Sequence, residues 1–184
     1  MRIARARHSP HMSDNRTWIL FLALSAVGLV GIAVDEGYSS KAYPDPANGK
    51  AVPTIGFGTT HNVRMGDTTT PVKALQRKLT DVQQFEGVLK ACVTAPLHQG
   101  EYDAYVNLAY NIGPQAFCGS TLVRRLNAED YEGACNAILM WRRVGITDCS
   151  HPQNRSCPGL WVRRQKLHAQ CLGEGAPNAA GAAR

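Results

Sequence analysis

Three kinds of pattern are missing from this sequence. It has no internal repeat, which excludes repeat and array architectures. It has no nucleic-acid-binding motif, so the net charge of +6 does not by itself indicate a nucleic-acid partner. The best candidate metal site would combine Cys149, His151, Cys157 and His168, whose spacing matches no standard zinc pattern. We therefore expect no metal, no cofactor and no nucleic acid.

Charge is also missing from one internal segment, Trp18 to Val34, which reads WILFLALSAVGLVGIAV. Its length lies at the lower end of the roughly 17–25 helical residues that span a bilayer core. Arginines outnumber acidic residues in the preceding stretch, a bias that keeps the N-terminus in the cytoplasm and sends the remainder outward. We predict a basic cytoplasmic tail at 1–17 and a transmembrane signal-anchor helix at 18–34.

Two other interpretations of residues 18–34 stay open. Gly31-Ile32-Ala33 is a small-x-small sequence that fits a cleaved signal peptide, and an apolar helix of this length also fits a buried core. We favour a retained anchor, because cleavage after Ala33 would leave Glu36 three residues from a frayed terminus. If Met12 is the true start, the orientation argument is weaker but survives.

All six cysteines follow the apolar segment. An even number confined to the exported part indicates disulfides in an oxidising compartment such as the periplasm. Six cysteines allow fifteen pairings. The pairing we favour is Cys92–Cys118, Cys135–Cys171 and Cys149–Cys157.

Two acids and a hydroxyl lie close together in DEGYSSKAYPDPANGKAVPTIGFGTT. Glu36 comes first, Asp45 follows in a Tyr-Pro-Asp-Pro turn, and Thr54 opens a β-branched, glycine-spaced stretch typical of a strand and tight hairpin. Glycosidic bond hydrolysis requires one carboxylic acid to protonate the leaving oxygen and a second carboxylate on the other side of the reacting carbon. The set therefore fits a glycosidase, although an acidic surface loop has the same composition.

The order of these motifs closely resembles the phage-type lysozymes, the endolysins of glycoside hydrolase family 24. Further matches follow, in HQGEYDA, NLAYNIG, STL and GLWVRR, so that the resemblance covers about residues 34–172. It implies that Glu36 is the general acid, that Asp45 holds the attacking water and that Thr54 positions that water. The stretch between Asp45 and Thr54 is longer than in the best-known members. Thr59 and Thr60 stand where many members have a histidine, with His61 just beyond.

The resemblance implies a mainly α, α+β lysozyme-like fold, with a small N-terminal β-hairpin lobe and a larger helical lobe joined by a long helix. The catalytic domain would cover 35–172, followed by a flexible tail at 173–184. Thr70-Pro71 is typical of a helix start, and apolar residues at helical spacing follow it. These are Val72, Leu75, Leu79, Val82 and Leu89. We expect further helices from about Gln99 to Asn111 and from Tyr131 to Trp141.

Asn111 and Ser120 are candidate substrate-binding residues, because the resemblance places their segment on the far wall of the cleft. Ser120 also precedes a helix and fits an N-cap. A second candidate set consists of arginines that would either line the cleft or, as we favour, solvate a helix face. This set is Arg142, Arg143, Arg163 and Arg164.

The sequence thus predicts a monomeric endolysin that hydrolyses the β-1,4 bond between N-acetylmuramic acid and N-acetylglucosamine in peptidoglycan. It resembles the signal-anchor-release subgroup, which is held in the inner membrane and released into the periplasm when a holin-type protein depolarises the membrane. Two rivals stay open. A lytic transglycosylase would use Glu36 without Asp45, and a non-enzymatic membrane-anchored wall-binding protein would need neither acid.

Overall fold

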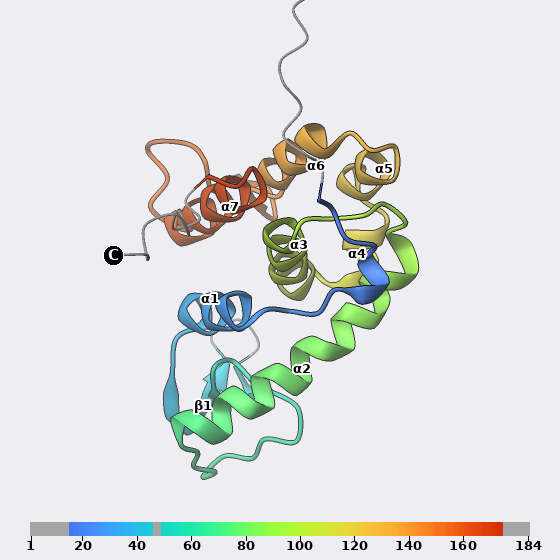
Figure 1. The fold of residues 1–184 in the computed structure, drawn as a ribbon. Helices are drawn as coiled ribbons and strands as arrows, with labels where there is room; N and C mark the ends of the chain where they lie inside the picture. Colours follow the sequence, from blue (N-terminus) through green and yellow to red (C-terminus); the bar gives the residue numbers. More distant parts are fainter. Residues whose placement is uncertain (1–14, 46–48, 175–184) are drawn as a thin grey trace, which may run out of the picture.

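The structure, a computed structural model, describes residues 15–45 and 49–174. In Figure 1 a two-stranded hairpin lies at one end, a long helix crosses the molecule, and shorter helices gather at the other end. The helices are α1 (Ala26–Glu36), α2 (Pro71–Cys92), α3 (Gln99–Ile112), α4 (Pro114–Cys118), α5 (Thr121–Asn127), α6 (Tyr131–Ala137) and α7 (Pro158–Cys171). The 3₁₀ turns are η1 (Ile19–Phe21) and η2 (Ile138–Met140), and the strands are β1 (Ser39–Asp45), β2 (Gly49–Gly56), β3 (Arg143–Val144) and β4 (Thr147–Asp148).

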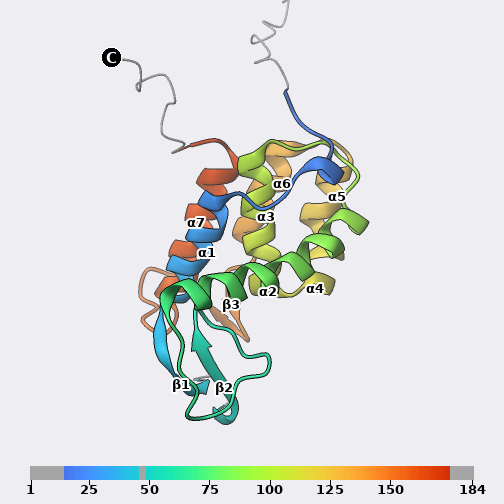
Figure 2. The same ribbon diagram turned by 60° about the horizontal axis from the view of Figure 1, so that its bottom comes forward.

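The helical lobe is organised around α3, in which residues 101–109 are all buried. A helix that is buried on every side must be covered by neighbours, and α1, α2, α4 and α7 each contact it. Figure 2 shows these helices arranged around α3. The predicted helix at Gln99–Asn111 is therefore confirmed, and the one predicted at Tyr131–Trp141 is α6 followed by η2.

The hairpin lobe is small, as the sequence predicted. Strands β1 and β2 pair antiparallel, with Ser39 opposite Gly56 and Tyr43 opposite Thr54. Gly56 has a positive φ, and a Cβ at this position would lie 2.8 Å from the Cβ of Ala74 on α2. The glycine therefore lets the strand end pack directly against the long helix that joins the two lobes.

The long helix α2 begins as predicted, because the Thr70 side chain accepts a hydrogen bond from the Lys73 amide and Pro71 is its first residue. Its buried face differs from the predicted stripe. Val72 is 68% exposed, whereas Val82 and Leu89 are fully buried. Two charged residues, Lys78 and Glu86, are also buried, since each finds a polar partner on α3.

The segment predicted as one helix at 18–34 is divided in this structure. Turn η1 is followed by extended residues, and α1 begins only after Ser25. The break is fixed by polar contacts, because Leu24 N donates to Glu86 Oε1 at 2.7 Å and Ser25 N donates to Asp103 Oδ1 at 3.0 Å. Within residues 15–45 and 49–174, no helix is both long and apolar enough to cross a membrane.

The six cysteines form three disulfides with the pairing that the sequence favoured. Cys92–Cys118 links α2 to α4, Cys135–Cys171 links α6 to α7, and Cys149–Cys157 closes the loop before α7. The sulfurs of the alternative metal set are thus bonded to each other. Most of the predicted basic tail, residues 1–14, and most of the predicted flexible tail, residues 175–184, lie outside the described residues.

Candidate active site

Glu36 is the last residue of α1, so the docking of this helix decides where its carboxyl group lies. Gly37 follows with a φ of +71°, which is open to glycine and strained for other residues. The Glu36 side chain is 25% exposed, and its Oε1 accepts a hydrogen bond from Arg163 Nη1 at 3.1 Å. Arg163 on α7, which belongs to the helical lobe, therefore fixes the position of the Glu36 carboxyl group.

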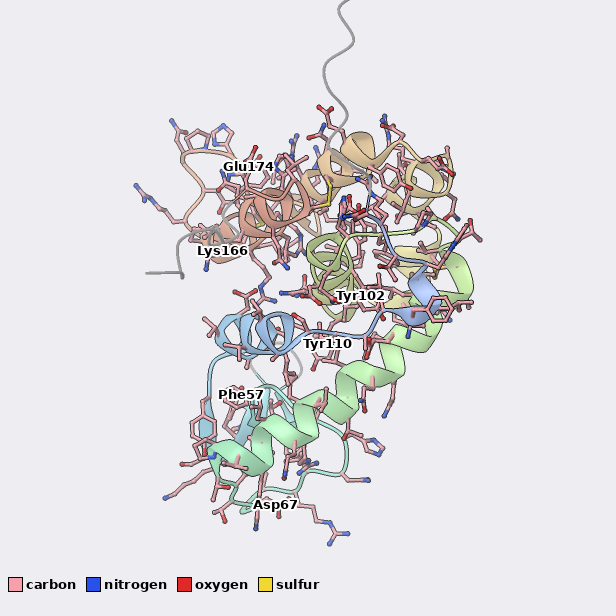
Figure 3. All side chains as sticks on the ribbon, in the orientation of Figure 1. Phe57, Asp67, Tyr102, Tyr110, Lys166 and Glu174 are labelled. Atoms are coloured by element: carbon pink, nitrogen blue, oxygen red, sulfur yellow. A yellow bond between two sulfur atoms is a disulfide. The ribbon has the colours of Figure 1, made fainter. Side chains whose placement is uncertain are left out.

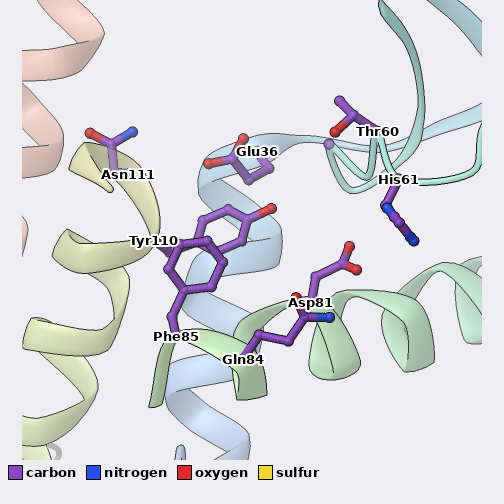
Figure 4. Close-up of a pocket in the computed structure, with 9 residues that line it drawn as sticks. Glu36, Thr60, His61, Asp81, Gln84, Phe85, Tyr110 and Asn111 are labelled. Carbon is purple, nitrogen blue, oxygen red and sulfur yellow. The ribbon is translucent and has the colours of Figure 1, made fainter. Parts of the chain in front are cut away.

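Glu36 lines a pocket of about 410 Å³ to which both lobes contribute. Figure 4 shows the acid above the ring of Tyr110, facing Asp81 of α2 and the segment that follows β2. The lining residues are Glu36, Gly58, Thr60, His61, Asp81, Gln84, Phe85, Tyr110 and Asn111. The pocket thus brings together side chains from α1, α2, α3 and the end of the hairpin.

Gly58 marks a close approach of the backbone to the acid. Its φ is +78°, and a Cβ at this position would lie 3.1 Å from Glu36 Oε2. A side chain would therefore press against the carboxyl group as well as strain the backbone. The glycine-spaced stretch after Thr54 thus brings its backbone against the acid itself.

The segment after Gly58 is tied to α2 by a threonine. Thr59 Oγ1 donates to Asp81 Oδ2 at 2.7 Å, and Thr59 is buried. His61 lines the pocket two residues later, and its carbonyl accepts a hydrogen bond from Arg77.

The two remaining members of the predicted triad lie on the hairpin. Asp45 is the last residue of β1, and its side chain lies outside the described residues. Thr54 lies in β2 opposite Tyr43 and is 4% exposed. Its Oγ1 is buried, and no described residue is a hydrogen-bond partner for it. A buried hydroxyl without a partner costs about 1–3 kcal/mol, so this atom is one that a bound water would stabilise.

The arginine pair on α7 does not solvate a helix face, so that interpretation is wrong. Arg163 donates to the carbonyl of Asp35 at 2.6 Å in addition to its contact with Glu36. Arg164 is 2% exposed and donates to Asn111 Oδ1 and to the carbonyl of Trp141. Burial is the main cause that lowers the pKa of Arg164, to about 10. The sequence did not favour these positions, because arginines in a polar helical stretch usually face solvent.

The other predicted residues divide between the pocket and the rest of the lobe. Asn111 lines the pocket, whereas Ser120 caps α5 by accepting a hydrogen bond from Val123 N. Arg142 and Arg143 lie near Asp148, at 3.0 Å and 3.8 Å. Hydrogen bonds from Ser150, followed by those from Arg142, lower the pKa of Asp148 to about 2.

This geometry defines a class of protein: a two-lobed, lysozyme-type fold with a carboxylic acid at the end of a helix, facing a cleft between hairpin and helices. Comparisons with known proteins give the same class. The family model described as "Phage lysozyme" matches residues 33–166. The endolysin of Salmonella phage P22 is 36% identical over 129 residues, which is 67% of this chain and 86% of that protein.

Two further relatives extend the comparison. The SAR-endolysin of Pseudomonas phage phiKMV is 36% identical over 150 residues, covering 82% of this chain and 89% of its own. A crystal structure of a P22 lysozyme variant superposes with a TM-score of 0.71 at 34% identity, covering 83% of this chain and 99% of that one. This chain belongs to the phage lysozyme family. It is a lysozyme-type hydrolase, as the sequence predicted.

Proposed function

We propose that the chain is an endolysin that hydrolyses the β-1,4 bond between N-acetylmuramic acid and N-acetylglucosamine, with Glu36 as the general acid. The observation that carries this proposal is the position of Glu36, at the end of α1 and facing a pocket open to solvent. A partly exposed carboxyl group in a cleft can reach the oxygen of a bound glycan, and general acid catalysis contributes about 10²–10⁴-fold.

Arg163 has a defined part in this reaction. Once Glu36 has given its proton to the leaving oxygen, the carboxylate is negative and lies 3.1 Å from the guanidinium. The ion pair stabilises the charge that forms on the acid and fixes the orientation of the carboxyl group. Asp35 keeps the arginine in place through its carbonyl.

Thr54 and Asp45 would manage the attacking water. Among the described residues the buried Thr54 Oγ1 has no hydrogen-bond partner, and Asp45 ends the strand that pairs with the strand of Thr54. Asp45 would activate a water on the face of the sugar opposite Glu36, which inverts the anomeric carbon. The product released by the parent chain would then be the α-anomer, which proton NMR detects before mutarotation.

The test of this mechanism compares purified wall digested by the parent chain and by three variants. Glu36→Gln is nearly isosteric but cannot act as the acid, so lysis should stop while the chain still folds. Asp45→Asn should lose most activity, and Thr54→Ala should lose less. Full activity of Asp45→Asn with a 1,6-anhydro product would establish a transglycosylase instead. Binding to wall without any cleavage by the parent would establish a non-enzymatic protein.

Residues 18–34 support a second part of the proposal, a signal anchor that leaves the membrane before the enzyme becomes active. Six large apolar side chains of this segment are exposed in the folded structure. They are Trp18, Leu20, Phe21, Val27, Val30 and Val34. Exposed apolar side chains at this density do not stabilise a folded domain, but they suit a segment that first resides in lipid.

Other side chains of the same segment pack closely against the helical lobe in the folded structure. Ile32 is fully buried, and Gly28 packs so closely that a Cβ there would lie 2.7 Å from Asp103 Cγ. Ser25 caps α1 and donates its hydroxyl to Asp103. Residues that face lipid in one state therefore pack against α3 in the other, and Glu36 reaches the cleft only in the second state.

Two glycine substitutions separate these states. Gly31 is exposed with no atom within 4 Å of an added Cβ, so Gly31→Leu strengthens insertion by several tenths of a kcal/mol without disturbing the folded lobe. Gly28→Leu strengthens insertion equally but also clashes with Asp103 and Leu24. We expect Gly31→Leu to delay lysis after an uncoupler or a holin acts, while the purified, folded enzyme keeps parental activity.

Membrane fractionation and N-terminal sequencing decide the outcome. The mature chain should retain residues 18–34, because removal up to Ala33 would delete the buried Ile32 and most of the helix that carries Glu36. If Gly31→Leu lyses cells as fast as the parent, or if the mature chain begins after Ala33, the release mechanism is wrong and an ordinary signal peptide is correct.

A further inference from the structure

Tyr110, which lines the pocket, is hydrogen-bonded to a buried lysine that the proposed mechanism does not use. Lys78 lies on α2 with no exposed surface, and its Nζ donates to Tyr110 Oη at 2.6 Å. The same ammonium lies 4.3 Å from the centroid of the Tyr110 ring. Lysine is almost never fully buried unless it is paired. The partner of Lys78 is a neutral tyrosine and not a carboxylate, so we ask what this pairing does.

While Lys78 is charged, the hydrogen bond between Lys78 and Tyr110 can have only one donor, which is the ammonium group. An ammonium group has three donors and no acceptor, so the phenol oxygen of Tyr110 must accept. The phenol's own proton is then left for a different acceptor. Within the described residues, the hydroxyl makes no hydrogen bond other than the one from Lys78.

The hydroxyl of Tyr110 points into the pocket. Tyr110 is a lining residue, and Figure 4 shows its ring beneath Glu36 with the hydroxyl directed into the space between Glu36 and Asp81. Tyr110 on α3 accepts the hydrogen bond of the ammonium, and the charges that act on it are those of Glu36 on α1, Asp81 on α2 and Arg163 on α7.

We propose that Tyr110 donates a hydrogen bond from its hydroxyl to an oxygen of the glycan beside Glu36, and that Lys78 is the positioning residue that makes this hydroxyl a donor. This proposal rests on the proposed function, because the ligand is the sugar on which Glu36 acts. A phenol held only by solvent would rotate and would accept or donate equally. A phenol that must accept from a buried ammonium presents its proton in one direction.

The electrostatic surroundings agree with these roles. Burial lowers the pKa of Lys78 and Arg163 adds to this, but Glu36 and Asp81 both favour the charged form. Burial, followed by the charges of Glu36 and Asp81, raises the pKa of Tyr110. The tyrosine therefore keeps the proton that it is to donate.

The experiment measures kcat and KM on soluble glycan strands for Tyr110→Phe, Lys78→Met and the double variant. Loss of one neutral hydrogen bond corresponds to about a three- to tenfold fall in kcat/KM, which we expect mainly in KM for both single variants. Because Lys78 acts through the hydroxyl, the double variant should be no worse than Tyr110→Phe alone. Tyr38→Phe is the matched control, since the Tyr38 hydroxyl donates to the Thr69 carbonyl and Tyr38 is not a lining residue of this pocket.

Each outcome is decisive. Unchanged kinetics of Tyr110→Phe would overturn the proposal, and this variant keeps the ring shape, so it tests the idea even if Lys78→Met fails to fold. If Lys78→Met lowers kcat/KM equally in the parent and in the Tyr110→Phe background, or shifts the pH profile there, Lys78 acts on another group and the positioning role is wrong. A parent chain that cleaves no glycan would instead refute the proposed function.

Discussion

The helical lobe and the hairpin lobe are held together by different means. All three disulfides lie in the helical lobe, where they connect α2 to α4, α6 to α7 and the two ends of one loop. The hairpin lobe depends on the β1–β2 ladder and on a few buried side chains such as Ile55 and Val63. Figure 3 shows the one disulfide visible in that view among the upper helices, far from the hairpin.

Because only the helical lobe is cross-linked, the residues on the two sides of the cleft are positioned in different ways. The cross-linked lobe supplies Arg163, Tyr110 and Asn111, whose positions depend on α3 and α7. The hairpin lobe supplies Gly58, Thr60 and His61, and the Thr59–Asp81 hydrogen bond ties their segment to α2. The side of the cleft formed by the helical lobe is therefore held by covalent cross-links. The side formed by the hairpin lobe depends on its packing against the helices.

The largest effect should come from removing the link between α6 and α7. Replacing Cys135 and Cys171 by alanine frees a loop of 36 residues, and loss of a native disulfide of this kind costs about 2–5 kcal/mol. Removing Cys149–Cys157, with a separation of 8, should cost less because the loop is shorter. Urea unfolding of the two double variants measures both.

A titration of thiols in denaturant accompanies this comparison. The oxidised parent should show no free thiol, because all six cysteines are paired. Finding two or more free thiols would contradict the pairing, and equal losses for the two double variants would contradict the dependence on loop length.

The next effect concerns the joint between the lobes. Asp103 accepts from both the amide and the hydroxyl of Ser25, which starts α1. Asp103→Asn removes the charge and one acceptor, and hydrogen bonds to a buried charged group contribute about 1–3 kcal/mol. We expect faster amide exchange in α1 and lower activity, since α1 carries Glu36. Exchange that rises equally in α7 would indicate a general loss of stability and not a loosened joint.

A substitution in the hairpin should have a smaller effect on stability than on activity. Gly58→Ala places a Cβ at φ +78° and 3.1 Å from Glu36 Oε2. The left-handed backbone costs about 1–2 kcal/mol, and the contact displaces the acid. Gly66→Ala has φ +99° but no neighbour within 4 Å, so it is the control for backbone strain alone. Similar activity for the two variants would show that Gly58 has no special relation to Glu36.

The smallest effect concerns Lys78 and appears as a pH dependence. Burial lowers the pKa of Lys78 below its usual 10.5, so the unfolded chain binds this proton more tightly than the folded chain. The free energy of unfolding of the parent should therefore rise with pH between the lowered pKa and 10.5, as the linkage relation requires. Lys78→Met should lack this increment, while all other titrating groups are common to both chains. Parallel stability curves would contradict a perturbed Lys78.

The sequence predicted those features of the fold that depend on interactions between residues close together in the chain. Thr70 and Pro71 start α2 because a hydroxyl cap and a fixed φ act within one turn. Lys78, Glu86 and Asp103 were not predicted to be buried, because charged residues in a helix normally face solvent. Their burial depends on partners more than fifteen residues away, namely Tyr110, Tyr102 and Ser25. The division of residues 18–34 has the same cause.

One consequence of the short loop before α7 concerns redox chemistry. The bond between Cys149 and Cys157 ends at the residue that precedes α7, and Arg163 lies on the following turns of that helix. The ion pair at Glu36 is therefore anchored by a covalent bond that forms only where thiols can be oxidised. A chain folded in a reducing compartment has α7 without this anchor, so the position of Arg163 beside Glu36 depends on oxidation of the two thiols.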